Sequence, residues 1–371
     1  MELGPSQMKV DLKGKSLAEL DTPCLLLDAD ALRCNLDFMA KYFSQRPAKL
    51  RPHFKSHKCT TLARLQMEAG AIGITCAKLG EAEVLADAGI KKILIANQIV
   101  GAVKIARLVE LCRRAEPIVA VDALENAGMI SEMASAAGVS VGVLVEVNIG
   151  MNRCGVAPGQ ATLDLVKKVA SLPALRFEGL QGYEGHIVDL RGAAEREQKV
   201  RVALQPLVET RRLIECAGIP VKIVTGGGTG SYTFTGDTEG VDEVQAGSYA
   251  AMDWWYSDIR PEFKQAMTIL TTVISRARPG FAILDVGRKG VGAEFGPPRV
   301  KTIPGAVISG FGSEEHAAVQ LPENATVKVG DHIELIPSHG CTTSNLYREF
   351  VVHRAGRVVD VWPIEGSGKL Q

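Results

Sequence analysis

LRPHFKSHKCTTLARLQME, residues 50–68, joins a short strand to a helix and places Lys55 at the junction. Residues 50–53 have the composition of a strand, whereas residues 59–68 carry apolar positions at helical spacing. In α/β folds such a junction lies at the open end of a barrel or crevice, where ligands bind. A desolvated lysine at such a place can act as a Schiff-base nucleophile, because burial lowers the pKa of an amine. The alternative is a surface lysine in a basic stretch, and the rest of the chain has to decide between them.

Strand-like runs alternate with helical stretches from about residue 48 to about residue 250. The runs are short, apolar and bounded by turn residues: 50–54, 72–76, 92–96, 118–121, 141–147, 177–183, 221–224 and 242–245. This alternation predicts an α/β fold in which a (β/α)8 TIM-like barrel is formed. A doubly wound open sheet is the alternative, since the sequence does not show whether the sheet closes.

The texture changes after about residue 258, where apolar runs are separated by Gly/Pro-rich turns without long helical patterns. These runs are 266–275, 281–286, 306–309, 332–337, 349–352 and 358–362. They predict a C-terminal all-β domain, with the early run 24–27 as a candidate member. We therefore predict a barrel over residues 28–258 and a β-domain made of residues 1–27 and 259–371.

The composition is that of an ordinary globular protein of 371 residues, with 46% apolar residues, 23% charged residues and zero formal net charge. Neutrality argues against nucleic acid or an anionic membrane as the main partner. The N-terminus is polar and does not resemble a secretion signal, and no apolar run is long enough to span a bilayer. The eight cysteines are scattered without CxxC spacing, which predicts a cytoplasmic protein with reduced thiols.

Two loops rich in small residues follow the seventh and eighth barrel runs: GGGTGSY, residues 226–232, and QAGSYAAMD, residues 245–253. Such loops expose backbone N–H groups, and barrels commonly bind phosphate after these two strands. A lone glycine run is often only a tight turn, but two such loops together with Lys55 predict a phosphate-bearing aldehyde cofactor, pyridoxal phosphate. NAD is disfavoured, because no GxGxxG follows an early strand.

Two further motifs contain candidate site residues. NIGMNRCGV, residues 148–156, places Arg153 on a glycine-flanked turn after the fifth run, where it is either an anion contact or an ordinary surface arginine. PSHGCTTSN, residues 337–345, contains His339 and Cys341, which would face the same side of an extended strand. Imidazole and thiolate suit a soft divalent metal, zinc above all, although a turn with a buried cysteine is the alternative.

These motifs together resemble the fold-type III pyridoxal-phosphate enzymes, and most closely the D-threonine aldolase and D-serine dehydratase group. The matching pieces occur in the order of that family: DTPCLLLD, RPHFKSHK, NRCGV, QGYEG, GGGTGSY, QAGSYAAMD, GSEEH, PSHGCTTSN and VVDVW. The resemblance implies an alanine-racemase-like barrel followed by a β-domain. It also implies a homodimer with the active site near the subunit interface.

The resemblance assigns roles to individual residues. Lys55 would hold the cofactor, Arg153 would contact its phenolic oxygen and Tyr183 would lie against its ring. The residues implied in phosphate binding are Gly227, Gly228, Thr229, Gly247, Ser248 and Tyr249. Gln245 stands where alanine racemases have an arginine at the pyridine nitrogen, and His339 and Cys341 match two metal ligands for Zn, or for Mn or Mg.

The motifs disagree about which bond is broken. GGGTGSY, YAAMD and AEFGPP resemble the D-threonine and 3-hydroxy-D-aspartate aldolases, but a His-x-Cys pair is typical of the D-serine dehydratases. The aldolases have a catalytic histidine six residues after the tyrosine, where this chain has Asp189, so the base is either His186 or Asp189. We expect an aldolase that cleaves a D-threonine-like or 3-hydroxy-D-aspartate-like substrate to glycine and an aldehyde. The alternatives are a D-serine-type dehydratase, an amino-acid racemase and a non-catalytic binding protein for pyridoxal phosphate.

Overall fold

Eight parallel strands form a closed ring in the computed structural model, which describes residues 11–311 and 313–371. The strands are β2 (Lys49–Leu50), β3 (Ile74–Cys76), β4 (Lys92–Gln98), β5 (Glu116–Val121), β6 (Val141–Glu146), β7 (Leu175–Gln181), β8 (Ile223–Gly226) and β9 (Glu243–Val244). Neighbours in sequence pair from β3 to β9, and β9 pairs with β2. The ring closes where the Ile72 and Thr75 N–H groups donate to the Leu50 and Pro52 carbonyls at 3.0 and 2.9 Å. The predicted barrel is therefore confirmed.

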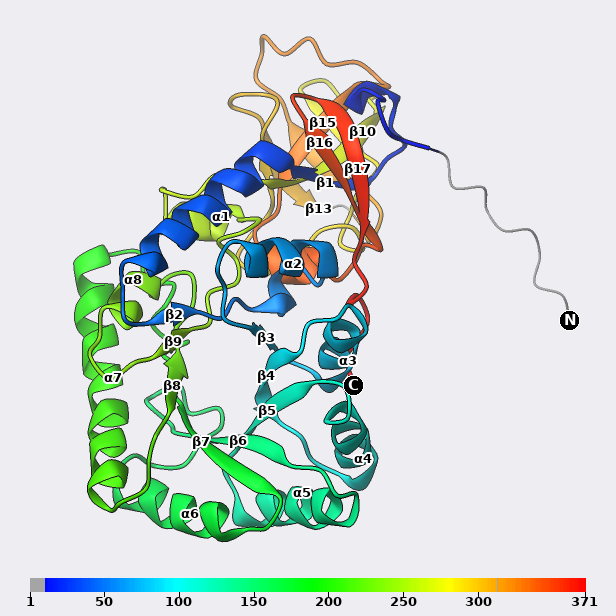
Figure 1. Ribbon diagram of the computed structural model, residues 1–371. Helices are drawn as coiled ribbons and strands as arrows, with labels where there is room; N and C mark the ends of the chain where they lie inside the picture. Colours follow the sequence, from blue (N-terminus) through cyan, green and yellow to red (C-terminus); the bar gives the residue numbers. More distant parts are fainter. Residues whose placement is uncertain (1–10, 312) are drawn as a thin grey trace, which may run out of the picture.

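Helices cover the outside of the barrel and bury one apolar stripe each against the strands (Figure 1). They are α3 (Leu79–Asp87), α4 (Ala102–Leu111), α5 (Leu124–Ala136), α6 (Gln160–Ser171) and α7 (Ala193–Cys216), whereas α2 (Thr60–Glu68) and the short α8 (Tyr232–Gly236) bury Leu62 and Tyr232 in the apolar cluster of the β-domain and α1. In α6, for example, Leu163, Val166 and Val169 are buried at helical spacing. The side chains of the barrel loops are thus held by a rigid scaffold.

The second sheet has nine strands in the order β11-β14-β13-β12-β15-β10-β1-β16-β17. The bounds are β1 (Cys24–Asp28), β10 (Met267–Ser275), β11 (Phe281–Leu284), β12 (Arg299–Val300), β13 (Val307–Phe311), β14 (Ala317–Gln320), β15 (His332–Ile336), β16 (Glu349–Arg354) and β17 (Arg357–Pro363). The predicted all-β domain is confirmed, whereas the short strands β12 and β14 were not predicted. β12 has only two residues and β14 is a short run of mainly small residues, so no strand pattern marks them.

Strand β1 lies inside this second sheet, between strands from the other end of the chain. Its Leu26 pairs antiparallel with Thr268 of β10 and parallel with Val351 of β16. Helix α1 (Ala29–Ser44) then carries the chain from this sheet to the barrel (Figure 1), and Asp28 caps its N-terminus by accepting the Asp30 and Ala31 N–H groups. The predicted boundaries at residues 28 and 258 stay a prediction.

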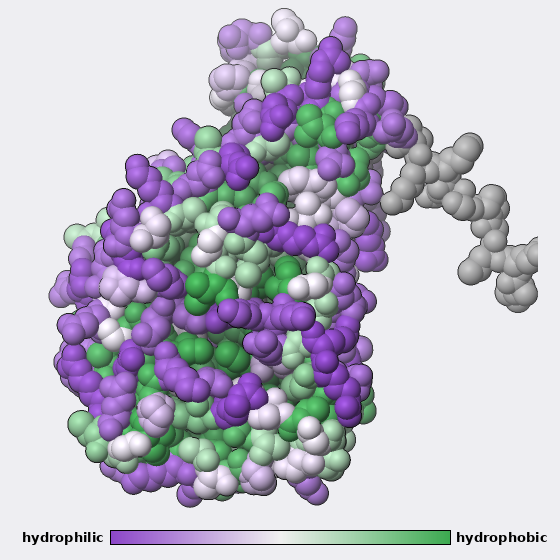
Figure 2. Space-filling model, in the orientation of Figure 1, coloured by the Kyte–Doolittle hydropathy of each residue, from purple (hydrophilic) through white to green (hydrophobic). Residues whose placement is uncertain are grey.

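Residues 1–10, which contain most of the predicted polar N-terminal segment, and Gly312 of the GSEEH motif lie outside the described residues. Hydrophilic residues cover most of the face shown in Figure 2, interrupted by small hydrophobic areas. The large apolar side chains instead form one cluster between barrel and helices and a second within the β-domain, α1 and α2. Over the described residues, no helix is both long and apolar enough to cross a membrane.

Candidate active site

A cavity of about 390 Å³ opens at the carboxyl ends of the barrel strands and is lined from the other side by residues of the β-domain. The predicted site residues in its wall are Lys55, Arg153, Tyr183, Asp189, Gly227, Gly228, Thr229, Gln245, Gly247, Ser248, His339 and Cys341. His186 and Tyr249 are the two predicted residues that do not line it. Residues spread over nearly 290 positions of sequence thus meet at one place, as the barrel topology requires.

Lys55 lies on a 3-10 turn, η2 (Phe54–Ser56), and not directly at a strand end. The predicted run 50–54 was too long, because β2 ends at Leu50 and Pro52 has no N–H with which to continue the ladder. His53 caps the turn, since its Nδ1 accepts the Lys55 N–H at 3.4 Å. Burial, followed by the nearby Lys55 charge, holds the pKa of His53 well below its usual range.

The loop after β8 is anchored from behind by Glu184, a buried residue beside Tyr183. The Glu184 carboxylate accepts the Gly227 N–H at 3.2 Å, the Ser231 Oγ hydroxyl at 2.7 Å and the Thr235 hydroxyl. The Gly228 N–H donates to Ser231 Oγ at 3.1 Å and is also occupied. Among the described residues, the cavity-lining backbone N–H groups left without a protein acceptor in the two loops are those of Thr229, Gly247 and Ser248.

Tyr249 is turned away from the cavity into the hydrophobic core. Its hydroxyl accepts a hydrogen bond from Gln66 Nε2 at 3.0 Å, and its side chain is 1% exposed. Its backbone N–H is also occupied, since it donates to Thr229 Oγ1 at 3.1 Å. The structure therefore does not place Tyr249 where a phosphate contact would need it.

Arg153 reaches the cavity from the loop after β6 and lies between Glu146 and Tyr183. Its Nη2 is 3.7 Å from Glu146 Oε1, and its guanidinium carbon is 5.7 Å from the centre of the Tyr183 ring. Burial raises the pKa of Glu146, although the hydrogen bond from Gln98 and the charge of Arg153 act in the opposite direction. Glu146 and Arg153 thus form a pair in which the carboxyl group can orient the guanidinium group.

Gln245 follows β9 and presents a neutral side chain to the cavity. Its Nε2 donates to Thr225 Oγ1 at 3.0 Å and to Gln181 Oε1 at 3.3 Å. A carboxamide at this position offers hydrogen bonds but brings no charge to the cavity.

His339 and Cys341 lie at the start of the short helix α10 (Gly340–Ser344). The prediction that they share an extended strand was wrong, because His339 is the N-cap and Cys341 lies in the first turn. The turn forms because the Gly340 N–H donates to Asp253 Oδ2 at 2.9 Å and the Thr343 hydroxyl donates to the His339 carbonyl at 2.8 Å. Both side chains nevertheless line the cavity.

The electrostatics of this pair are strongly coupled. Burial opposes protonation of His339, but the Cys341 thiolate and the Asp253 carboxylate outweigh it and raise the pKa of the imidazole to about 10. Burial also opposes ionisation of Cys341, yet the charges of His339 and Lys55 lower the pKa of its thiol. Nδ1 of His339 is 3.5 Å from Asp253 Oδ2 and has no hydrogen-bond partner within the described part of the chain. The imidazole of His339 is half-buried and has its buried Nδ1 turned to a carboxylate, as in many metal-binding histidines.

The two candidate bases are separated by the structure. Asp189 lines the cavity, whereas His186 is exposed and its ring lies against Gly150. Both follow the same strand, β7, but the loop between them turns so that only Asp189 faces inward.

Several cavity residues were not singled out from the sequence: His53, Asn97, Gln181, Tyr256 and Phe295. Asn97 and Gln181 stand at the ends of β4 and β7, a position that could have marked them. Tyr256, on α9 (Trp254–Ser257), and Phe295 reach the cavity through tertiary packing alone, and Phe295 stacks on Trp255 with ring centres 4.6 Å apart.

Within residues 11–311 and 313–371, no cluster of three or more His, Cys, Asp or Glu side chains has the arrangement of a metal site. His339 and Cys341 supply two donors, which leaves the remaining positions of a four-coordinate metal to non-protein ligands. The donor chemistry fits a soft divalent cation but does not by itself complete a site.

Two family models match the chain and divide it near the point where the two sheets meet. Residues 27–253 match the alanine racemase N-terminal domain, and residues 266–353 match the putative serine dehydratase domain.

Curated relatives match over nearly the whole length. The chain is 38% identical over 360 residues to a D-threonine aldolase from Arthrobacter sp, which covers 96% of this chain and 95% of that protein. It is 34% identical over 369 residues to a 3-hydroxy-D-aspartate aldolase from Paracoccus denitrificans, with coverages of 96% and 95%. Among solved structures, the D-threonine aldolase from Filomicrobium marinum superposes with a TM-score of 0.94 at 38% identity, covering 97% of this chain and 99% of that one.

Proposed function

Since this chain belongs to the fold-type III pyridoxal-phosphate lyases of the D-threonine aldolase and D-serine dehydratase family, we propose that it is a metal-dependent aldolase. Its substrate would be a D-β-hydroxy-α-amino acid, D-threonine-like or 3-hydroxy-D-aspartate-like, and its products glycine and an aldehyde. One observation carries the proposal: a single cavity contains Lys55, the His339–Cys341 pair and loop N–H groups that have no acceptor among the residues the structure describes. These are the parts needed to hold an aldehyde phosphate and to polarise a hydroxyl.

The cofactor would be held at both ends by residues of the barrel. Lys55 would bind its aldehyde carbon, and the N–H groups of Thr229, Gly247 and Ser248 would bind its phosphate. Gly227 and Gly228 belong to the loop that would approach the phosphate, and Gly227 has a φ of 75° and too little room for a Cβ, which would lie 3.1 Å from Thr235 Cγ2. When bound, pyridoxal phosphate would accept the electron pair that is left on Cα when the Cα–Cβ bond breaks.

Arg153, Tyr183 and Gln245 would orient the cofactor ring. Arg153 would meet the phenolic oxygen, for which its position between Glu146 and Tyr183 is suitable. Gln245 would face the ring nitrogen with a neutral carboxamide held by Thr225 and Gln181. Asp189 is not hydrogen-bonded to any of these three side chains, so its carboxylate is not engaged in orienting the cofactor ring.

His339 and Cys341 would bind a divalent metal, with zinc preferred over manganese or magnesium because of the thiol. When bound, the metal would lower the pKa of the substrate's β-hydroxyl. The Asp253 carboxylate beside His339 Nδ1 supports this assignment, since it would direct the other ring nitrogen outward.

Asp189 is the stronger candidate for the base that removes the β-hydroxyl proton, because it lines the cavity and His186 does not. In the cleavage, the hydroxyl proton would pass to Asp189 while the hydroxyl oxygen forms the new carbonyl. His186, exposed beside Gly150, would act only if its loop moved inward.

Dehydration is the second candidate, and the His-x-Cys pair is the observation that favours it. In that reaction Lys55 would remove the α-proton and hydroxide would leave from the β-carbon, giving a keto acid and ammonia. The residues at the cavity are the same, so the product distinguishes the two reactions.

The experiment is a product analysis with purified protein, added pyridoxal phosphate and Mn²⁺ or Zn²⁺. D-threonine should give glycine and acetaldehyde, and D-serine should give little pyruvate. Keto acid and ammonia as the main products would replace the aldolase assignment by the dehydratase one. Asp189→Asn should abolish cleavage while His186→Ala retains it, and the opposite result would assign the base to His186.

We also propose a cytoplasmic homodimer. The location is supported by all eight cysteines being free thiols in the structure. The dimer is supported by the family resemblance, and sedimentation velocity at several concentrations would test it.

A further inference from the structure

Residues 365–368, which follow β17, bind the turn that carries Lys55. The Gly366 N–H donates to the Lys58 carbonyl at 2.9 Å, and Lys58 Nζ lies 3.4 Å from the Gly366 carbonyl oxygen. A Cβ on Gly366 would be 2.7 Å from Phe54 Cε1 and 3.1 Å from the Lys58 carbonyl, so a glycine is needed for this contact. The segment is therefore fitted closely against the back of η2.

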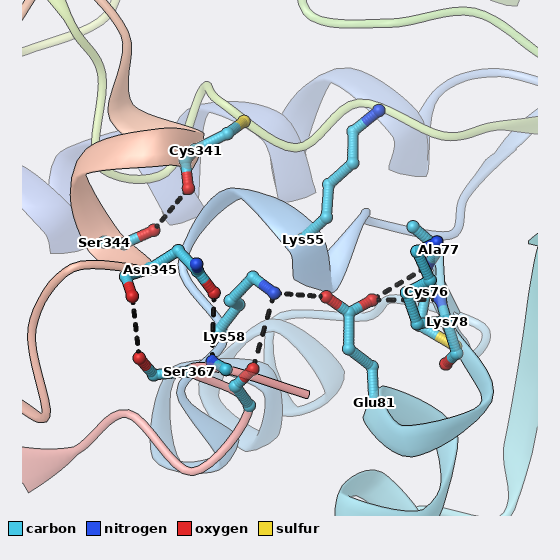
Figure 3. Close-up of polar contacts among 12 residues, drawn as sticks. Lys55, Lys58, Cys76, Ala77, Lys78, Glu81, Cys341, Ser344, Asn345 and Ser367 are labelled. Carbon is cyan, nitrogen blue, oxygen red and sulfur yellow. Dashed lines mark hydrogen bonds and ion pairs between the residues drawn. The ribbon is translucent and has the colours of Figure 1, made fainter. Parts of the chain in front are cut away.

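The same segment also binds the helix that carries Cys341. The Gly368 N–H donates to Asn345 Oδ1 at 3.0 Å, and Ser367 Oγ donates to the Asn345 carbonyl at 2.9 Å. Asn345 directly follows α10, and in α10 Ser344 Oγ donates to the Ser56 carbonyl at 3.0 Å. Together with the Ser344–Ser56 bond, these contacts form a closed circuit through η2, residues 365–368 and α10; Figure 3 shows the contacts of Lys58, Ser367 and Asn345.

Lys58 stands at the centre of this circuit although it does not line the cavity. Its Nζ forms a 2.8 Å ion pair with Glu81, and the side chains are only 8% and 1% exposed. The second Glu81 oxygen accepts the N–H groups of Ala77 and Lys78, at 2.8 and 3.3 Å, where α3 begins. Lys58 also has a φ of 56°, in a region that side chains other than glycine rarely adopt. Such backbone strain persists only where surrounding contacts enforce it.

The distance between η2 and α10 matters because the two elements act on neighbouring atoms of one substrate. In the proposed function Lys55 lies next to the amine on the substrate's Cα, while the His339–Cys341 pair acts at the hydroxyl on Cβ. In Figure 3 the Lys55 and Cys341 side chains extend in the same direction from their two elements. A shift of about 1 Å in such an arrangement can cost 100-fold in rate.

We propose that Lys58 is a positioning residue: with Glu81 and residues 365–368 it fixes the Lys55 turn against the helix that carries Cys341. This inference rests on the proposed function, because it takes its two endpoints from there. It differs from a purely structural role in one respect. A substitution at one end of the circuit should change ligand affinity at the other end, at a site that the substituted residue does not contact.

The test uses two variants of the full chain. Lys58→Met combined with Glu81→Gln removes the ion pair without leaving a buried charge unpaired. Asn345→Ala removes the acceptor for Gly368 at the far end of the circuit. The control is Lys222→Met, which removes a surface lysine from its ion pair with Glu178.

For each protein, pyridoxal phosphate is titrated into cofactor-free protein, and binding is followed by visible absorption. Co²⁺ is titrated into chelator-treated protein by its thiolate charge-transfer absorption, with a thermal melt alongside.

The double variant should weaken Co²⁺ binding at His339 and Cys341 by about tenfold, and Asn345→Ala should weaken cofactor retention at Lys55 by a similar factor. Lys222→Met should change neither. A fall in melting temperature with both affinities unchanged would overturn the inference, as would an effect confined to the element that carries the substitution. If the unmodified protein binds neither pyridoxal phosphate nor Co²⁺, the proposed function itself fails, and that result is distinguished by the unmodified protein alone.

Discussion

Replacing Glu184 by glutamine should weaken phosphate binding without weakening aldehyde binding. Glu184 is fully buried, and its carboxylate accepts from the Gly227 N–H, from Ser231 Oγ and from Thr235 Oγ1. Glutamine has the same shape and keeps one oxygen that accepts hydrogen bonds. Its NH2 group, however, replaces the other oxygen and would face a group that is itself a hydrogen-bond donor. Hydroxyls can rotate to adapt, whereas the Gly227 N–H cannot.

The expected loss follows from this count. A hydrogen bond to a charged group contributes about 1.5–3 kcal/mol, and the variant loses about one such bond net. At 1.4 kcal/mol for each factor of ten, this corresponds to a dissociation constant for pyridoxal phosphate that rises about 10- to 100-fold. The loss arises because the loop after β8 then spends less time in the conformation that directs the Thr229 N–H into the cavity.

The assay is a titration of cofactor-free protein with pyridoxal phosphate and, separately, with pyridoxal, which lacks the phosphate. Glu184→Gln should weaken only the phosphate-bearing ligand. Equal weakening of both ligands would show that Glu184 acts on the whole cavity, and no weakening of either would refute its role as the anchor of the loop. Thermal unfolding of the cofactor-free variant shows whether the lost hydrogen bond also lowers the stability of the fold.

The remaining predictions concern stability and packing. Burial lowers the pKa of His57 to about 4, so between about pH 4 and pH 6.5 this histidine is protonated in the unfolded chain but neutral in the folded chain. Stability is therefore lost as pH falls from about 6.5 to about 4, and His57→Gln should remove roughly 3 kcal/mol of that loss in urea unfolding at several pH values. Arg51→Met should cost about 3–5 kcal/mol by leaving Glu243 buried without its bidentate partner, and adding Glu243→Met should recover most of it. A Cβ at Gly230 would overlap the Val188 carbonyl oxygen, so Gly230→Ala should destabilise by about 1–3 kcal/mol and weaken pyridoxal phosphate binding.

The barrel could be predicted from the sequence because its strands are buried on both faces. Val141–Glu146, for example, is buried at every position and, apart from its terminal Glu146, contains only Val, Leu and Gly. The closure of the ring was beyond the sequence, since it depends on pairings between residues 50–52 and 72–75 around Pro52. Strands β12 and β14 were missed because they are short or alternate weakly between small residues.

The site was predictable where the position along the chain decides the outcome. Lys55, the small-residue loops and Arg153 all follow barrel strands, and the fold brings such positions together at one end. Side-chain direction within a loop was not predictable. Tyr249 and His186 follow the right strands but turn away, because loop dihedral angles and tertiary packing set their direction. The helix at His339 depends on a bond to Asp253, a residue far away in sequence.

The place of β1 between β10 and β16 has a consequence for the order in which the chain can fold during synthesis. Leu25–Leu27 are synthesised long before β16, yet one edge of this strand pairs with β10 and the other with β16. At 5–20 residues per second, roughly 15–60 s separate the synthesis of β1 from that of β16. The barrel is complete long before then. We therefore expect β1 to keep an unpaired edge until β16 is made, and an unpaired apolar strand edge favours non-native pairing.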